Sequence, residues 1–391
     1  MNFEKSQLLD GLPEQFFASL VQKVNKQVEQ GFDVINLGQG NPDQPTYDYI
    51  VDALCQAARN PETHKYSQFR GNLPFKKAVT EFYQNNYHVS LDSQTEVCVL
   101  GGAKLGLVEL PWALMNPGEL ILLPDPGYPD YLSGVALGKI DFETFPLKEE
   151  NQFLPDLKAI PEETARRAKY LYLNYPNNPT GAVATQEFYD ELVIWAKKYE
   201  VGIISDFAYG ALGLDGFKNP SFLSSEGAKD VGIEIYTFSK TFNMAGWRLA
   251  FAVGNKDIIE ALNLIQDHLF VSVFPAIQEA GIKALLEPKA TEEIKGLNAK
   301  YDRRRHAFVE AAAAIGWKVF PSKGSFYAWM PVPDGFTSQS FADLLLEKTH
   351  VAVAPGIGFG KEGDGYVRIG LLVEPERLVE AVERIKQLDL F

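Results

Sequence analysis

Short apolar, β-rich runs alternate with helical stretches along most of the chain, and this alternation predicts its secondary structure. Several of the apolar runs are nearly continuous, as expected for strands of a parallel sheet that helices cover on both faces. The predicted strands are residues 96–100, 120–123, 170–174, 202–205, 234–238 and 249–253, and the predicted helices are 105–114, 185–199 and 256–269.

Strands that alternate with helices predict an α/β fold with a mainly parallel sheet. The last third of the chain has a different pattern, which predicts a smaller α+β domain, and a helix near 13–30 would pack on it. We therefore expect a large domain over 41–280 and a small domain made of 1–40 and 281–391, with a break near 278–288. In the last third, helices are predicted at 299–315, 338–348 and 375–388, and strands at 318–320, 326–331, 351–354 and 366–371.

Composition narrows the range of functions. A chain of 391 residues can bury two sizeable cores. The net charge of −14 argues against a nucleic-acid partner, because contacts with phosphates require a basic face. Cys55 and Cys98 form neither a disulfide framework nor a CxxC pair, and the five histidines are scattered, so we expect no metal site. With no signal-like apolar region at the start and no run approaching roughly 20 apolar residues, we expect a cytoplasmic protein without a membrane anchor.

The most informative segment is 236–248, Tyr-Thr-Phe-Ser-Lys-Thr-Phe-Asn-Met-Ala-Gly-Trp-Arg. Lys240 follows two hydroxyl residues, Thr237 and Ser239, and precedes Arg248 by eight positions. A lysine amine can form an imine with an aldehyde, while hydroxyl groups and a guanidinium suit a phosphate. This combination indicates pyridoxal 5′-phosphate, which carries both groups. An ordinary surface lysine is the alternative, but the neighbouring residues are mostly apolar and small.

A glycine pair lies between a predicted strand and a predicted helix. Gly101 and Gly102 are followed by Ala103 and Lys104, which open the helix. Exposed N–H groups at a helix start attract anions, and glycine lets a phosphate approach the backbone. The pair alone is equally a simple turn, so it indicates a phosphate site only in combination with the Lys240 segment.

Asp206 ends another apolar strand. The carboxyl ends of parallel strands face the crevice of an α/β sheet, where a carboxylate could pair with a protonated pyridine nitrogen. Tyr209, three residues later, could reach the phenolate oxygen of the ring. A helix N-cap is the competing interpretation of Asp206.

Two proline-rich strings also follow strands. Residues 174–181, Asn-Tyr-Pro-Asn-Asn-Pro-Thr-Gly, form a turn that could present Asn178 to the ring and the substrate. Residues 125–131 include Tyr128, which could stack on the pyridine face. Plain loops are the alternative for both strings.

Arg368 lies among apolar neighbours in a strand-like run. The guanidinium fork suits the carboxylate of an amino or 2-oxo acid, although a structural salt bridge is an alternative. Gly40 could offer its N–H to the same carboxylate. The glycines of 353–360 resemble a dinucleotide fingerprint only loosely and lack the following helix, so we reject a nicotinamide dehydrogenase.

Together these strings resemble the class I/II aminotransferases, pyridoxal phosphate enzymes of fold type I, over nearly the whole chain and in the family's order. The resemblance implies that Lys240 forms the internal Schiff base and moves the substrate proton, and that Asp206 holds the pyridine nitrogen. Tyr209 and Asn178 would bind the ring oxygen, and Tyr128 would stack on the ring.

The resemblance also implies a substrate site and a partner. Arg368, with Asn178 and Gly40, would take the α-carboxylate of an amino acid or 2-oxo acid. Tyr66 would reach the phosphate of the neighbouring subunit in a homodimer with shared active sites. The phosphate would be held by Gly102, Ala103, Lys104, Thr237, Ser239 and Arg248.

Within this family, the segments 12–17, 67–71, 210–216 and 336–341 look like those of bacterial methionine-salvage transaminases. This likeness implies 4-methylthio-2-oxobutanoate or other neutral or aromatic amino acids as substrates. Phe16 and Phe17 could line an apolar pocket that suits a thioether, or could pack in the core. The alternatives are a pyridoxal phosphate-dependent C–S β-lyase and an aminotransferase of the aspartate or LL-diaminopimelate type. A regulatory domain that only senses the cofactor disagrees with the acidic chain and the early start of the catalytic pattern.

Overall fold

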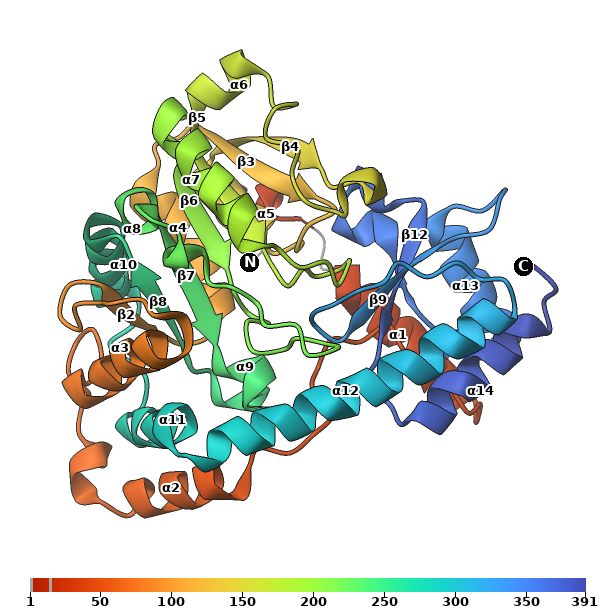
Figure 1. Ribbon diagram of the computed structural model, residues 1–391, viewed down its shortest axis with the longest axis horizontal. Helices are drawn as coiled ribbons and strands as arrows, with labels where there is room; N and C mark the ends of the chain where they lie inside the picture. The colour runs from red at the N-terminus through yellow and green to blue at the C-terminus, as the bar shows by residue number, and fades with distance from the viewer. Residues whose placement is uncertain (1–2, 14–15) are drawn as a thin grey trace.

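The computed structural model describes residues 3–13 and 16–391. A seven-stranded sheet, ordered β2-β8-β7-β6-β5-β3-β4, forms the centre of the larger part (Figure 1). Strands β3 to β7 run parallel, while β8 runs antiparallel to both of its neighbours. The predicted α/β class with a mainly parallel sheet is therefore confirmed. The strands are β2 (Val97–Leu100), β3 (Leu120–Asp125), β4 (Asp141–Pro146), β5 (Ala168–Asn174), β6 (Gly202–Asp206), β7 (Gly232–Thr237) and β8 (Ala250–Gly254).

Helices cover both faces of this sheet because successive strand residues point to opposite sides. Ile203 packs in one apolar cluster with α3 (Leu73–Tyr87) and α7 (Gln186–Tyr199). Its neighbour Ile204 packs in a second cluster, on the opposite face. The helices of that second cluster are α4 (Ala103–Leu114), α5 (Tyr131–Gly138) and α10 (Lys256–Leu269).

The smaller part contains a three-stranded antiparallel sheet, ordered β11-β12-β9, and a two-stranded parallel pair, β1-β10. Its apolar cluster joins helix residues such as Phe308, Phe341 and Leu378 with Trp317 and with Ala328 and Val367 of the small sheet. The elements are α1 (Phe16–Glu29), β1 (Ile35–Asn36), β9 (Tyr327–Pro331), α13 (Ser338–Thr349), β10 (Val351–Ala352), β11 (Ala354–Pro355), β12 (Tyr366–Gly370) and α14 (Pro375–Lys386).

One long helix, α12 (Lys289–Ala314), connects the two parts, as Figure 1 shows. Ala290 near its start packs with the core of the large sheet, and Phe308 near its end packs with the core of the small sheet. Because one apolar cluster consists only of residues from 1–40 and 281–391, we propose the division into 41–280 and 1–40 with 281–391. Trp329, Ala354 and Phe359 of the smaller part pack in the cluster of the large sheet, so the two parts share apolar contacts. The predicted break at 278–288 overlaps α11 (Pro275–Leu286), which packs on α2 (Asp48–Ala58).

Three predicted elements differ from the structure. The strand predicted at 318–320 is wrong, because this segment joins no sheet. The helix predicted at 299–315 begins ten residues earlier, at Lys289. The strand predicted at 351–354 is two short strands, β10 and β11. The helix predicted near 13–30 is α1, and its residues 14 and 15 lie outside the described residues. Over the ranges 3–13 and 16–391, no helix is long and apolar enough to cross a membrane.

Candidate active site

The carboxyl ends of three neighbouring strands meet at one edge of the large sheet. Asn174 ends β5 and pairs in register with Asp206, which ends β6, and Thr237 ends β7 beside them. A cavity of about 310 Å³ lies at this edge. Of the residues predicted for the site, those that line the cavity are Gly40, Ala103, Lys104, Tyr128, Asn178, Asp206, Tyr209, Thr237, Ser239, Lys240, Arg248 and Arg368.

Lys240 lies in α9 (Phe238–Thr241), a single helical turn directly after β7. Thr237 caps this turn, since its hydroxyl accepts a hydrogen bond from the Ser239 N–H. The Lys240 Nζ donates to the Gly40 carbonyl at 2.8 Å. Burial, with smaller effects from Arg368 and Arg248, lowers the pKa of Lys240 to about 8, although Asp206 opposes the shift. About a tenth of this amine is therefore neutral near pH 7.

Asp206 is a buried carboxylate that is only half satisfied. Its Oδ2 accepts a hydrogen bond from the Tyr131 hydroxyl at 2.8 Å, whereas its Oδ1 is buried without a hydrogen-bond partner in the described chain. Burial raises the pKa of Asp206 to about 6, even though Tyr131, the Ala208 N–H and Lys240 each favour the charged form. A turn follows β6, so the helix N-cap interpretation is wrong. The free oxygen suits a protonated nitrogen within the cavity.

A second group of residues at the cavity, near the start of α4, is suited to an anion. Gly102 caps α4 with a φ of 105°, and a Cβ at this position would collide with the Arg248 guanidinium. Arg248 is fixed in turn by a 2.7 Å hydrogen bond from its Nη1 to the Ala245 carbonyl. The Thr237 and Ser239 hydroxyls are 3.0 Å apart on the same rim. A helix start, two hydroxyls and a guanidinium together fit a phosphate.

Lys104 contributes differently from Arg248. Its ammonium forms an ion pair with Asp130 at 2.9 Å, so its backbone N–H at the start of α4 is the group available to an anion. Tyr66 does not line the cavity, and its side chain is 93% exposed. It is therefore free to contact another molecule.

Arg368 lies in β12 and is almost fully buried. Its Nη1 donates to the Asn178 Oδ1 at 2.8 Å, and its Nη2 donates to the Gly38 carbonyl at 2.9 Å. No acidic side chain of the described residues forms an ion pair with it, so the structural salt-bridge interpretation is wrong. A buried guanidinium with neutral partners favours an anionic ligand.

Aromatic rings surround the Arg368 guanidinium. The ring centroids of Tyr327, Phe359 and Phe17 lie 4.3, 4.8 and 5.1 Å from its Cζ. Phe17 lines the cavity, whereas Phe16 packs edge-on against Phe17 and Phe359. The two predicted uses of this pair, pocket lining and packing, thus fall to different residues.

Three residues of the site were not predicted as such. Tyr131 and Asn174 lie within the quoted strings. The Tyr131 hydroxyl donates to Asp206, 75 residues later, whereas the Asn174 Oδ1 accepts from the Asn178 N–H within the same string. Tyr327 was placed only in a predicted strand, yet its hydroxyl lies 3.3 Å from that of Tyr209. The strand-end position of Asn174 was the one available signal; the other two depend on tertiary packing.

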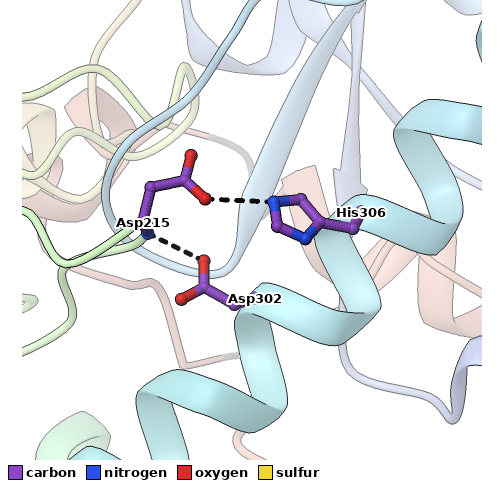
Figure 2. Close-up of side chains that lie close together, drawn as sticks. All are labelled: Asp215, Asp302 and His306. Atoms are coloured by element: carbon purple, nitrogen blue, oxygen red, sulfur yellow. Dashed lines mark hydrogen bonds and ion pairs between the residues drawn. The ribbon is translucent and has the colours of Figure 1, made fainter.

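A second polar cluster lies outside the cavity. Asp215, Asp302 and His306 converge between a loop and α12, as Figure 2 shows. His306 contacts the Asp215 Oδ1 at 3.0 Å, and the Asp215 N–H donates to Asp302 at 2.9 Å. The Arg305 guanidinium already pairs with Asp215. We interpret the cluster as a structural ion-pair network.

The sequence and the fold of the chain are similar to those of known proteins. Residues 33–385 match the family model of class I and II aminotransferases. L-glutamine--4-(methylsulfanyl)-2-oxobutanoate aminotransferase of Bacillus subtilis is 58% identical over 391 residues, which is 100% of this chain and 98% of the relative. LL-diaminopimelate aminotransferase of Halothermothrix orenii is 45% identical and covers 99% of each chain. The substrate-bound structure of BacF from B. subtilis superposes with a TM-score of 0.94 at 46% identity, covering 100% and 98% of the two chains.

Proposed function

The chain belongs to the class I and II aminotransferases, and we propose that it transfers an amino group to 4-methylthio-2-oxobutanoate, which yields methionine. Transamination itself, between an amino acid and a 2-oxo acid, follows from the family. The proposed substrate rests on the chemistry of the cavity together with the activity for which the 58% identical relative is named, whose methylsulfanyl substrate is the same compound.

The residues of the cavity fit pyridoxal 5′-phosphate, on which this family depends. The unpartnered Asp206 Oδ1 suits the protonated ring nitrogen. Gly102, Ala103 and Lys104 at the start of α4 would hold the phosphate, together with Thr237, Ser239 and Arg248. When bound, the cofactor supplies an aldehyde for attachment of an amine and a ring that accepts electrons.

The chain's own groups then have distinct tasks. The Lys240 Nζ, partly neutral near pH 7, would accept the proton from the substrate α-carbon and return it at the other reacting carbon. Asp206 would keep the ring nitrogen protonated, and the hydroxyl of Tyr209 and the amide of Asn178 would donate to the ring oxygen. Tyr128 would cover one face of the ring and exclude water from it.

Arg368 would orient the substrate by its carboxylate. The Asn178 Oδ1 and the Gly38 carbonyl fix the guanidinium, and the three surrounding rings limit its rotamers. A carboxylate bound here would place the α-carbon toward Lys240, which donates to Gly40 on the same side. Orientation of this kind supplies a large part of the rate enhancement when an enzyme brings two reacting groups together.

The charges that line the cavity favour a neutral substrate side chain. Five charged residues of the described part of the chain line the cavity. Each of them already has an ion-pair partner or a proposed role with the cofactor or the substrate carboxylate: Lys104, Asp206, Lys240, Arg248 and Arg368. Within one chain, the distal ammonium and carboxylate of LL-diaminopimelate would therefore meet no matching group, whereas Phe17 offers an apolar contact that suits a thioether. This charge inventory is the observation that carries the substrate proposal.

We also propose a homodimer in which both chains complete each site. Tyr66, Phe69, Phe270 and Phe274 are all exposed apolar residues, and Arg70 ties their two segments together through a 2.9 Å hydrogen bond from its Nε to Asp267. Arg248, at the phosphate end, is also exposed. A second copy would cover this surface and place a Tyr66 at the phosphate, as the family pattern implies. A monomeric mass in analytical ultracentrifugation would contradict this proposal.

A substrate panel tests the function. Purified protein loaded with pyridoxal phosphate is given 4-methylthio-2-oxobutanoate, 2-oxoglutarate, oxaloacetate or an aromatic 2-oxo acid, with glutamine, glutamate or an aromatic amino donor. We expect the highest kcat/KM with the methylthio compound. Dominant exchange between aspartate and 2-oxoglutarate, or transfer from LL-diaminopimelate, would contradict the substrate. Release of pyruvate and ammonia from cysteine conjugates without an acceptor would instead indicate a β-lyase.

A further inference from the structure

Tyr327, the first residue of β9, contacts both a proposed cofactor ligand and the proposed substrate ligand. It is 1% exposed, and its hydroxyl lies 3.3 Å from the hydroxyl of Tyr209. Its ring centroid lies 4.3 Å from the Arg368 Cζ. The same hydroxyl occupies the space that a side chain at position 40 would need, so Gly40 is the residue that fits beside it. Tyr327 thus contacts three parts of the proposed site. These are Tyr209, which would bind the ring oxygen, Arg368, which would bind the carboxylate, and Gly40, whose carbonyl accepts from Lys240.

We propose that Tyr327 is a positioning residue whose hydroxyl donates to the Tyr209 oxygen and thereby directs the Tyr209 hydroxyl proton toward the cofactor's ring oxygen. Its aromatic ring meanwhile supports Arg368. The inference rests on the proposed function, because it assumes that pyridoxal phosphate occupies the cavity and that Tyr209 faces its ring oxygen.

The direction of the hydrogen bond follows from what surrounds Tyr209. A phenol hydroxyl has one proton to donate and two lone pairs to accept with. If Tyr209 donated to Tyr327, it would meet the ring oxygen only as an acceptor, and two oxygen lone pairs would repel. Donation from Tyr327 removes this conflict, and hydrogen bonds in such a chain strengthen one another. The titratable groups that face Tyr209 are Tyr327, Arg368, Asp206 and Lys240.

A single substitution separates the hydroxyl from the ring. In Tyr327→Phe the aromatic support of Arg368 remains, while the donor to Tyr209 is lost. Because donation to an anionic ring oxygen favours its deprotonated form, weaker donation should raise the pH midpoint of the absorbance change of the lysine-linked cofactor. A shift of roughly 0.3 to 1 unit is expected for one weakened hydrogen bond. The KM for the 2-oxo acid should change by less than about twofold, since the ring over the guanidinium stays in place.

The Tyr209→Phe background tests whether Tyr327 acts through Tyr209. In that background, adding Tyr327→Phe should leave the midpoint unchanged, because the group that relays the effect is gone. An equal shift in both backgrounds would contradict the relay and indicate direct action or a general loss of packing. Tyr366→Phe is the matched control, because this tyrosine lies in the adjacent strand, stacks on Trp329 and does not line the cavity.

The outcomes also separate this inference from the function on which it rests. If the wild-type protein develops no absorbance with pyridoxal phosphate, the proposed function fails. If the wild type titrates normally and Tyr327→Phe has the same midpoint, or a lower one, only the role of Tyr327 fails. A raised midpoint that disappears in the Tyr209→Phe background supports the proposal.

Discussion

Two walls of the cavity hold their functional side chains by different means. The sheet-edge wall (Asn174, Asp206, Thr237 and Lys240) follows the carboxyl ends of adjacent strands in the seven-stranded sheet. The arginine wall (Arg368, Tyr327, Phe17 and Phe359) is assembled from two strands of the small sheet, helix α1 and a 3-10 turn near residue 359. The first wall is set by chain connectivity, and the second by how distant segments pack.

This difference has an energetic consequence. In the sheet-edge wall, Lys240 and Asp206 perform chemical tasks that no other side chain shares, so the loss of either should remove a step of the reaction. In the arginine wall several weak contacts share the task of fixing one guanidinium, so only the guanidinium itself should be indispensable. Substitutions in the two walls therefore predict a graded series of effects.

The largest effect is expected for Lys240→Ala in the sheet-edge wall. Turnover should fall by roughly 10⁴-fold or more, because both the attachment of the aldehyde and the proton transfer lose their amine. The cofactor absorbance of the lysine-linked form should disappear, and borohydride should trap no adduct at this position. Lys218→Ala, an exposed lysine outside the cavity, is the control. Full activity of Lys240→Ala would overturn the whole assignment.

The pH dependence of Lys240 sharpens this prediction. Burial lowers the pKa of the amine to about 8, and the neutral form is the nucleophile. In apoprotein mixed with pyridoxal phosphate, the rate of aldehyde capture should rise about tenfold per pH unit below 8 and level off above it. Stopped-flow absorbance measures this rate. A plateau reached only above pH 10 would show that the site does not perturb the lysine.

The next effect is expected for Arg368→Lys in the arginine wall. Lysine keeps the charge but loses the planar fork that binds a carboxylate with two hydrogen bonds. The KM for 2-oxo acids should rise by roughly 10²-fold, with a smaller change in kcat. Arg377→Lys, at a partly exposed ion pair with Asp33, should leave both constants unchanged. An unaltered KM in Arg368→Lys would place the carboxylate elsewhere.

A smaller effect is expected for Gly102→Ala, at the start of α4 where the phosphate is proposed to bind. The added Cβ would meet the Arg248 guanidinium, and the positive φ disfavours alanine, so Arg248 must move away from the phosphate position. The affinity for pyridoxal phosphate should fall by about tenfold, as measured by titration of the apoprotein. Gly296→Ala, an open position in α12, is the control. Unchanged affinity would argue that the phosphate lies away from Gly102.

The same contrast explains what could be predicted from the sequence. The buried strands of the sheet, and the polar residues that end them, followed from apolar runs and from the rule that parallel strands end at one edge. Strand β4 was not predicted because it is the outermost strand of the sheet and most of its residues are exposed, so it forms no continuous apolar run. Helix α12 was predicted too short because its first turns are polar.

In the arginine wall, the sequence indicated Arg368 through its apolar neighbours but not the groups that hold it. Tyr327 precedes it by 41 positions and Phe17 by 351, so no local pattern links them. The Tyr131 hydroxyl on Asp206 is a similar case, since 75 residues separate the two partners. Such contacts depend on tertiary packing, which strand and turn signals do not encode.

The smallest effect is expected for Phe17→Leu, which tests whether the arginine wall also recognises the substrate side chain. Leucine keeps the apolar lining but removes the ring that lies 5.1 Å from Arg368, a contact worth roughly a two- to fivefold change in binding. Because every 2-oxo acid uses Arg368, the loss of this contact alone should raise KM equally for pyruvate and for 4-methylthio-2-oxobutanoate. A sulfur–aromatic contact with Phe17 would add a further loss for the methylthio substrate only.

Phe16→Leu is the matched control, since Phe16 packs against Phe359 but does not line the cavity. Equal changes for both substrates would limit Phe17 to supporting the guanidinium, and a larger change for the methylthio compound would make it part of the specificity pocket.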